Sequence, residues 1–493
     1  MTSVKIPASL GIVCLIALLG GCAVGPDWVR PKPPPVSGFT RTPPPETLAP
    51  GFGEPEQHFV SGEEISTDWW ELFHSPELSD AVRDAIAGNQ TLAAAQATLA
   101  NAQEALVQAR AAFYPEINLT GQAERQKTAL RGNTSRQTPA FNLFSLGPVL
   151  SYSPDVFGGT RRQVEQAAAQ AEHQNYQLAA AYLMLTGNVV SQAINIAGTR
   201  HEIAATEEII ADDEKNLDLV RAKYEGGKAA QTDVLTAESQ LMNDRVLLPP
   251  LRQQLSTAND ALTILLGRFP AEWSAPEYDL DRMVLPGELP VSLSSDLVHQ
   301  RPDILASEAS LHAASAAIGV ATAQLYPSIT LSASVGFETF MTSGMSTATS
   351  EMWQLASGLT APIFQGGALE AQKRGAIDNF RGALATYQQT VLQAFGQVAD
   401  TLQALAHDAD LVAAARHALD VASNSLALQQ ISYQAGKSDV LLLIEAQRLA
   451  QQARLAYVNA EAQRYQDTAQ LFVAMGGRWW TQSDFGAAPP PMG

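Results

Sequence analysis

The chain has 493 residues, of which 46% are hydrophobic and 16% charged, so it is too apolar for a disordered segment and long enough for a large core. Its formal net charge of −19 argues against a nucleic-acid partner, which would need clustered lysine and arginine. There are two cysteines, and Cys14 lies in a segment that we expect to be removed, which excludes a disulfide scaffold. Because no run approaches 18 apolar residues, no transmembrane helix is predicted, and any membrane crossing would be made by strands.

The first 21 residues resemble a secretory signal peptide. A single cation, Lys5, precedes the apolar run 10–19, which is too short to cross a bilayer as a helix. Leu19-Gly20-Gly21-Cys22 resembles the lipobox of bacterial lipoproteins, in which the cysteine is lipidated and becomes the new N-terminus. The alternative is a buried or stray cysteine. Ala23 follows, rather than the aspartate that retains such lipoproteins at the inner membrane, so the resemblance implies the outer membrane.

Proline marks where helices can form. Ten of the 28 prolines precede residue 51, so we expect an extended, polyproline-like tether there. In contrast, no proline occurs in residues 155–248 or 363–488, which permits very long helices. Within the first stretch, mostly apolar residues recur at alternating spacings of four and three from Val164 to Val189, which predicts a heptad seam.

Three sequence features occur twice, in the same order. Their offsets are 212, 208 and 209 residues, so coincidence is a poor explanation and two structural repeats are present. The matched pairs are 113–117 (Phe-Tyr-Pro-Glu-Ile) with 325–329, 153–159 (Ser-Pro-Asp-Val-Phe-Gly-Gly) with 361–367, and 224–228 (Tyr-Glu-Gly-Gly-Lys) with 433–437.

Each copy is expected to contain a helix that ends at Tyr-Pro, two strands, a long helix after Gly-Gly, and a shorter helix that returns after a glycine turn. A helix of about 66 residues is roughly 100 Å long, so the glycine turns are expected at the far end of a helical barrel from the strands. The expected helices are 79–112, 160–225 and 233–266 in the first copy and 302–325, 368–434 and 441–474 in the second, with hairpins at 113–155 and 326–364.

Four strands cannot close into a membrane barrel, which needs at least about eight, and an open sheet edge is intolerable in lipid. The chain is therefore expected to oligomerise. Three copies would supply twelve strands for the membrane barrel and twelve helical segments for the wall of the helical barrel. Two or four copies also satisfy the strand count.

Several short motifs follow one another along nearly the whole mature chain. They are the lipobox with 22–27 (Cys-Ala-Val-Gly-Pro-Asp), Gly-Gly after each hairpin, 248–252 (Leu-Pro-Pro-Leu-Arg), 265–267 (Leu-Leu-Gly), 301–304 (Arg-Pro-Asp-Ile) and 471–477. This ordered set resembles the TolC-like outer-membrane efflux factors, in the NodT lipoprotein branch.

The resemblance implies a mainly α fold with a membrane β-barrel: a duplicated strand-strand-long-helix repeat that forms a trimer with a twelve-stranded barrel and an α-helical periplasmic barrel. It implies six segments, namely a signal peptide (1–21), a lipidated extended segment (22–75), repeat 1 (76–267), an equatorial connector (268–300), repeat 2 (301–477) and a C-terminal tail (478–493). Together with the two termini, the connector would form a belt around the helices.

The implied function is that of a passive exit duct in a tripartite efflux system, with a periplasmic adaptor and an inner-membrane RND pump as partners. The alternatives are a structural coiled-coil lipoprotein, the exit duct of a type I secretion system and, more distantly, a periplasmic hydrolase. Catalytic, metal-binding and phosphate-binding motifs are missing from the sequence, so we expect neither an enzyme nor a cofactor. The exported substrate cannot be read from the sequence.

In that family, apolar and acidic rings on the returning helices close the periplasmic tip. Matching residues 439–447 to the family's Leu-x-x-x-Asp-Ala-Gln pattern assigns Leu441 to the apolar ring and Glu445 to the acidic ring, with Glu in place of the usual Asp. Further candidates at this gate are Asp439, Tyr433 and, in the first copy, Asp233. For each carboxylate the alternative is an ordinary solvated residue of a helix.

Basic pairs recur near the start of each long helix, as Arg161-Arg162 and Lys373-Arg374. Contact with lipid headgroups and simple solvation are equally acceptable explanations. Capping is not one, because cations at a helix N-terminus oppose the macrodipole.

Overall fold

A computed structural model describes residues 23–36, 38–42, 45, 47–48, 56–63, 65–127, 140–341 and 350–477. The predicted lipidation site Cys22, the signal peptide and the C-terminal tail lie outside these residues. The chain divides into two compact units, which are described separately. Unit 1 contains residues 1–31, 98–174 and 307–387, and unit 2 contains 32–97, 175–306 and 388–493.

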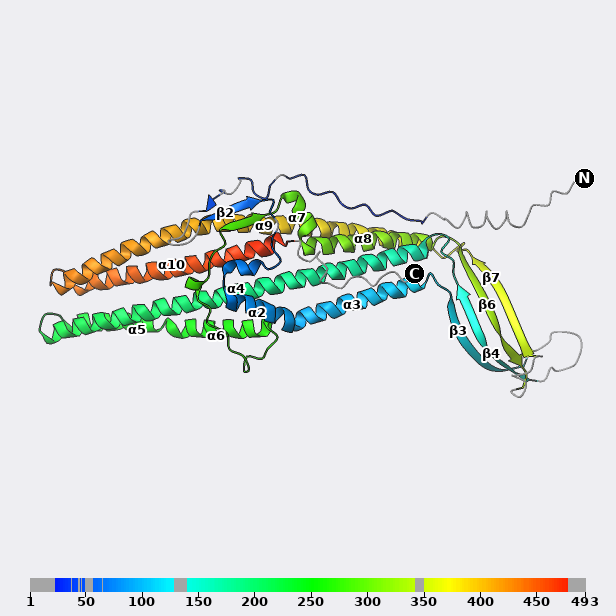
Figure 1. The fold of residues 1–493 in the computed structure, drawn as a ribbon, viewed down its shortest axis with the longest axis horizontal. Helices are drawn as coiled ribbons and strands as arrows, with labels where there is room; N and C mark the ends of the chain where they lie inside the picture. The colour runs from blue at the N-terminus through cyan, green and yellow to red at the C-terminus, as the bar shows by residue number, and fades with distance from the viewer. Residues whose placement is uncertain are drawn as a thin grey trace, which may run out of the picture. The chain divides into compact units, whose positions relative to one another are not determined.

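Two long helices dominate the secondary structure (Figure 1). Helices α4 (Gly159–Glu225) and α9 (Ala368–Gln434) each have 67 residues, and each begins in unit 1 and ends in unit 2. Their bounds agree with the expected helices to within one residue. Each is therefore about 100 Å long at helical rise.

The remaining helices are shorter. They are α2 (Pro76–Gly88), α3 (Gln90–Ala111), α5 (Gln231–Arg245), α6 (Leu248–Leu265), α7 (Ser294–Gln300), α8 (Pro302–Ala323) and α10 (Val440–Met475), with 3-10 turns η1 (Trp69–Phe73) and η2 (Leu280–Arg282).

Two helices that the sequence predicts as continuous are each broken once. The expected helix 79–112 is interrupted at Asn89, which has ψ 122° and whose side chain accepts from the Leu92 N–H (3.0 Å) to start α3. The expected helix 233–266 is interrupted before Pro249-Pro250, which occupy the first turn of α6, where a missing N–H is tolerated. The corresponding helix of the second copy, α10, is continuous.

Unit 1 contains a four-stranded antiparallel sheet in the order β3-β4-β6-β7. Its strands are β3 (Glu116–Gln126), β4 (Phe141–Tyr152), β6 (Ser328–Thr339) and β7 (Glu351–Thr360). The pairing of β4 with β6 joins the two copies, with Tyr152 opposite Leu331 and Phe144 opposite Thr339. Within the described residues, β3 and β7 are the edge strands.

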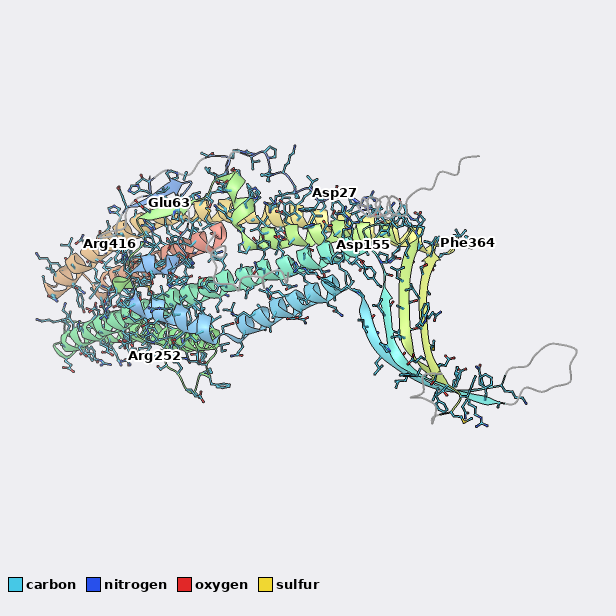
Figure 2. The ribbon with its side chains drawn as sticks, turned by 45° about the vertical axis from the view of Figure 1, so that its right-hand side comes forward. Asp27, Glu63, Asp155, Arg252, Phe364 and Arg416 are labelled. Carbon is cyan, nitrogen blue, oxygen red and sulfur yellow. The ribbon has the colours of Figure 1, made fainter. Side chains whose placement is uncertain are left out.

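The edge strands carry exposed apolar side chains. Leu119 on β3 is 74% exposed, and Trp353 and Leu355 on β7 are 81% and 75% exposed. Just beyond β7, Phe364 is 88% exposed and projects from the chain in Figure 2. Such apolar edges need a nonpolar environment or a neighbouring strand.

Unit 2 contains a small sheet that joins the N-terminal segment to the connector. Strand β2 (Gln57–Ser61) pairs antiparallel with β1 (Thr47–Leu48) and parallel with β5 (Glu288–Val291). The fully buried Gln57 donates to the Pro286 carbonyl (3.1 Å) and accepts from Arg464 Nε of α10 (3.0 Å). Within the segment expected to be a tether, Leu48 of β1 is buried and the ring of Phe39 lies 5.4 Å from that of Phe395 of α9, so these residues are packed on the protein.

Among the described residues, only α8 is long and apolar enough to cross a membrane. Its best 18-residue window has a mean hydropathy of 1.3, but 67% of that window is buried within the protein, as in the core helix of a soluble protein.

Candidate functional site at the helical hairpins

The two helical hairpins turn in the same way. Gly227 and Gly436 both have φ +72°, a conformation that disfavours any side chain. In each turn the N–H of the following lysine donates to a carbonyl five residues back, at 2.7 Å for Lys228 and 2.9 Å for Lys437. The repeated Gly-Lys pattern in the sequence therefore encodes one kind of helix end.

The predicted gate residue Tyr433 is buried beside these turns. It is 4% exposed and belongs to an apolar cluster that also contains Leu217, Leu241 and Leu443. Lys223 Nζ lies 3.4 Å from the centre of its ring and donates to the Tyr433 carbonyl. Burial, then the charge of Asp233, raises the pKa of Tyr433. Its ring thus holds the α4–α5 and α9–α10 hairpins together inside one protomer.

The predicted gate residues Asp439 and Asp233 both cap a returning helix. Asp439 precedes α10 and accepts from the Leu442 N–H (3.0 Å). Asp233 lies in the first turn of α5 and accepts from the Ala230 N–H (3.0 Å). Such caps stabilise a helix by about 1 kcal/mol. Both carboxylates therefore fix the start of a returning helix, Asp439 as the N-cap of α10 and Asp233 from the first turn of α5.

Leu441 and Glu445 lie on the exposed face of α10. They are four residues apart, hence on one side of the helix, while Val440 and Leu443 face the apolar cluster. Leu441 is 62% exposed. Glu445 forms a two-point ion pair with Arg448, at 2.5 Å and 3.0 Å, and these hydrogen bonds lower the pKa of Glu445. This face is available to line an aperture.

A buried polar cluster links the second hairpin to the first. Asp213 of α4 accepts from Gln447 (3.2 Å) and Gln451 (3.3 Å) of α10, and Gln451 also donates to Asp244 of α5 (3.1 Å). The pKa of Asp213 is raised to about 7, mainly by burial and further by a hydrogen bond to Asp244 and the charge of Asp244. The hydrogen bonds from Gln447 and Gln451 act in the opposite direction and lower it. Asp213 therefore keeps its proton to a higher pH than an ordinary aspartate does.

Sequence reasoning missed both Arg448 and the Asp213 cluster. A weak signal was present for the cluster, since Gln447 and Gln451 are spaced four apart on α10. Asp213, in contrast, stands in the acidic run 212–214, which reads as a solvated helix face.

The structure separates the roles of the two arginines in the first basic pair. Arg162 is 5% exposed, which excludes simple solvation, and it bonds to Asp27 and Glu165. Arg161 pairs with Asp155 (3.3 Å). The Asp155 carboxylate in turn accepts from the backbone N–H groups of Thr160 and Arg161 (both 2.9 Å) at the start of α4.

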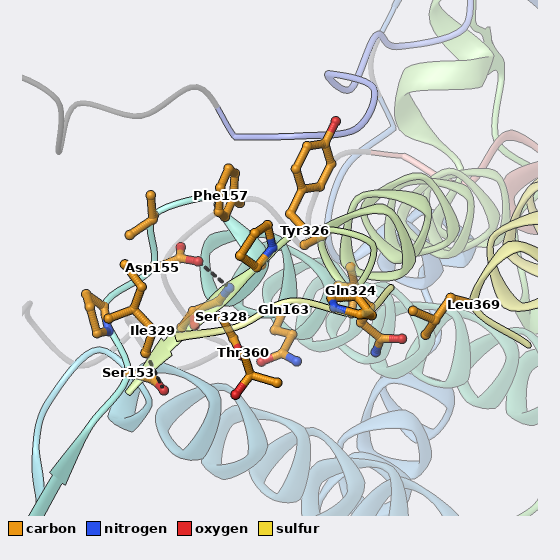
Figure 3. A pocket seen from close by; sticks show the side chains of 18 of the residues that line it. Ser153, Asp155, Phe157, Gln163, Gln324, Tyr326, Ser328, Ile329, Thr360 and Leu369 are labelled. Carbon is orange, nitrogen blue, oxygen red and sulfur yellow. Dashed lines mark hydrogen bonds between the residues drawn. The ribbon is translucent and has the colours of Figure 1, made fainter. Parts of the chain in front are cut away.

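A cavity of about 450 Å³ lies beside Asp155, where the strands of unit 1 meet its helices (Figure 3). Phe157 and Tyr326, which are stacked with ring centres 4.9 Å apart, both contribute to its lining. Each comes from one of the duplicated motifs, so the cavity lies at the boundary between the two copies.

The sequence model of the family described as "Outer membrane efflux protein" matches residues 81–268 and 293–477, well over half of the chain. The chain belongs to this family. The efflux protein is 30% identical over 454 residues to the pyoverdine export outer membrane protein OpmQ of Pseudomonas aeruginosa, covering 89% of this chain and 94% of that protein. It is 27% identical over 470 residues to nodulation protein T of Rhizobium leguminosarum bv. viciae, covering 95% and 93%.

Solved structures support the fold of this efflux protein. The outer-membrane channel OprN matches with a TM-score of 0.85 at 25% identity, over 93% of this chain and all of that one. CusC matches with a TM-score of 0.80 at 24% identity, which supports the fold alone. The family resemblance and the fold class of the trimeric TolC-like channels are therefore confirmed, as is the function of an outer-membrane efflux channel.

Proposed function

We propose that this efflux protein is lipidated at Cys22, works as a homotrimer, and forms a passive exit duct for an inner-membrane RND pump docked through a periplasmic adaptor. The observation that carries this proposal is the four-stranded sheet, whose edge strands β3 and β7 both present exposed apolar side chains. Because a sheet in lipid must satisfy its edges, neighbouring copies are the natural partners. No catalytic role is part of the proposal.

In the proposed trimer, Leu441 and Glu445 narrow the periplasmic end. Their shared exposed face on α10 supports this role, and the caps formed by Asp439 and Asp233 would fix where the returning helices start. Tyr433 would act from within the protomer, by holding the two hairpins together. Glu445 is paired with Arg448, so the proposed acidic ring would be a ring of ion pairs.

Single-channel conductance across planar bilayers tests the duct and its gate. Leu441→Ala with Glu445→Ala should raise the conductance, because two side chains that narrow the aperture are shortened. Leu411→Ala, which shortens a 51% exposed leucine of α9 more than 20 residues before the glycine turn, is the control and should leave the conductance unchanged. An unaltered conductance in the double variant would show that the constriction lies elsewhere. If the wild-type protein does not conduct, the proposal of a duct is wrong and the structural lipoprotein is the remaining explanation.

The proposal does not specify the exported substrate. The names of similar proteins refer to pyoverdine export, toluene efflux and antibiotic efflux. These proteins are 26% to 30% identical to this chain, so resemblance does not choose among their cargoes. A passive duct meets solutes that the pump has already selected, and export by a type I secretion system is the second arrangement to test.

A further inference from the structure

Residues 23–31, here called the strap, lie against both copies of the duplication. They carry neither helix nor strand. The Val24 N–H donates to the Phe157 carbonyl (3.1 Å), and the Val24 carbonyl accepts from Arg162 Nε of α4 (3.2 Å). Other strap residues contact α8. Because α4 belongs to the first copy and α8 to the second, the strap bridges them.

Two glycines let the strap approach the helices closely. A Cβ on Gly25, which has φ +98°, would lie 2.4 Å from the Cα of Gly319 in α8. A Cβ on Gly158, which has φ +80°, would lie 2.6 Å from the Cα of Ala23. Both contacts therefore require glycine.

The surface beneath the strap holds two buried charges of opposite sign. Arg162 is 5% exposed and donates to Asp27 (2.8 Å) and Glu165 (2.7 Å). Glu308 of α8 is also 5% exposed and accepts from Arg30 (2.5 Å). A buried charge that loses its partner is strongly destabilising. The strap supplies the cation for Glu308 and, in addition to Glu165, a second anion for Arg162; this second anion, Asp27, is labelled in Figure 2.

An aromatic stack lies between the two ion pairs. The ring of Trp28 lies 4.7 Å from that of His312 of α8 at an interplanar angle of 17°. His312 Nε2 is 3.0 Å from Glu165, which also binds Arg162. The strap contacts thus form one connected network.

The spacing of these contacts fixes one register. Glu308, His312 and Gly319 follow one stripe of α8, and the eleven residues from first to last span about 16.5 Å at helical rise. Their strap partners are Arg30, Trp28 and Gly25, in that order. The five steps from Gly25 to Arg30 also span about 16.5 Å in an extended chain. The strap and α8 run antiparallel and match in length.

We propose that the strap is an intramolecular staple that joins the two copies in one register through the Arg162–Asp27 and Glu308–Arg30 pairs. It fastens the chain where β4 leads into α4 and α8 leads into β6, next to the β4–β6 pairing that joins the copies in the sheet. The staple does not require lipid on Cys22.

A charge exchange in the purified full-length protein tests the staple. Arg30→Glu should lower the midpoint of heat unfolding by about 3 °C or more, because it places a second carboxylate against buried Glu308. Adding Glu308→Arg should restore most of that loss. The control Lys32→Glu makes the same charge change at an exposed residue two positions away and should shift the midpoint by no more than about 1 °C.

A second comparison applies if Glu308→Arg does not fold. Arg30→Ala should cost less in a Glu308→Gln background than in the wild type, because a neutral amide no longer needs the cation. Equal costs in both backgrounds, or an Arg30→Glu variant as stable as Lys32→Glu, would overturn the staple. Since the readout is heat stability, a protein that shows this coupling without conducting would refute the duct and leave the staple standing.

Discussion

At the residue scale, two pairs of neighbouring aspartates in unit 2 each contain a buried member whose pKa is raised. Asp213 on α4 pairs with Asp244 on α5, and Asp408 on α9 pairs with Asp467 on α10. The pKa values of Asp213 and Asp408 are both raised to about 7. Burial is the largest cause, and a hydrogen bond to the neighbouring carboxylate and the charge of that carboxylate add to it. Each pair links a long helix to the returning helix of the same copy, so protonation bears on how both hairpins pack.

The raised pKa of Asp213 predicts how stability depends on pH. An ordinary aspartate has a pKa of 3.8, so between that value and about 7 the folded protein holds a proton that the unfolded chain releases. Its contribution to the free energy of unfolding is present below about pH 4 and is lost as pH rises to about 7. Asp213→Asn imitates the protonated acid, so it should raise the heat-unfolding midpoint at pH 8 relative to wild type and have little effect at pH 4.

Asp212→Asn is the control for this measurement. Asp212 is half-exposed and pairs with Lys215 (2.9 Å), so its loss should not change the pH profile. An Asp213→Asn protein with the same dependence on pH as the wild type would show that this pair does not hold a proton.

Arg448 predicts the ion selectivity of the proposed aperture. Its removal leaves the Glu445 carboxylate unpaired and exposed, so Arg448→Ala should raise the ratio of cation to anion permeability in bilayer recordings. Arg252→Ala breaks a comparable exposed pair, with Glu207 on the surface of α6 and α4, and should not change selectivity. Equal ratios for the two variants would place Glu445 away from the ion path.

Matching to the family's pattern could place Leu441 and Glu445 on one exposed face of α10, because the pattern spaces them four residues apart, while their role at a gate stays a prediction. The roles of Asp439 and Asp233 as caps depend on backbone N–H groups nearby in the chain, which a helix start also predicts. Arg162 and Asp213 could not be assigned in this way. Their partners lie more than 130 and 230 residues away, at Asp27 and Gln447, and only the folded chain brings them together.

At the scale of elements, the two copies have the same long helix but different returning helices. α4 and α9 have equal lengths and end in equivalent glycine turns, whereas the first-copy return is split into α5 and α6 and the second-copy return is the single helix α10. Proline spacing predicted the long helices because it bounds where a helix can run. It could not predict the break at Asn89, which depends on a hydrogen bond to the Leu265 carbonyl (2.9 Å).

The glycine turns predict a matched pair of stability losses. Gly227→Ala and Gly436→Ala should each destabilise by about 1 kcal/mol, because both residues have φ +72° while a Cβ would meet nothing within 4 Å among the described residues. Gly396→Ala, inside α9 and also free of contacts, should instead stabilise by about 0.5 kcal/mol. Denaturant unfolding measures all three. A loss at Gly396 equal to that at the turns would rule out backbone conformation as the cause.

At the scale of the whole molecule, the described protomer is incomplete as a membrane protein. Its sheet has four strands, with exposed apolar residues on both edge strands, and the Leu441–Glu445 face of α10 is uncovered. The sequence predicted the need for more copies from strand count alone, since a closed barrel needs about eight strands or more. It could not fix their number, because two, three and four copies all satisfy that arithmetic.

The number of chains in the conducting particle is the sharpest test of a duct whose wall is built by several copies. The protein is extracted from outer membranes in mild detergent, its native mass is measured, and the same fraction is recorded in planar bilayers. We expect a particle of three chains that conducts. A single chain that conducts by itself, or a three-chain particle that never conducts, would contradict a duct whose wall is shared among identical protomers.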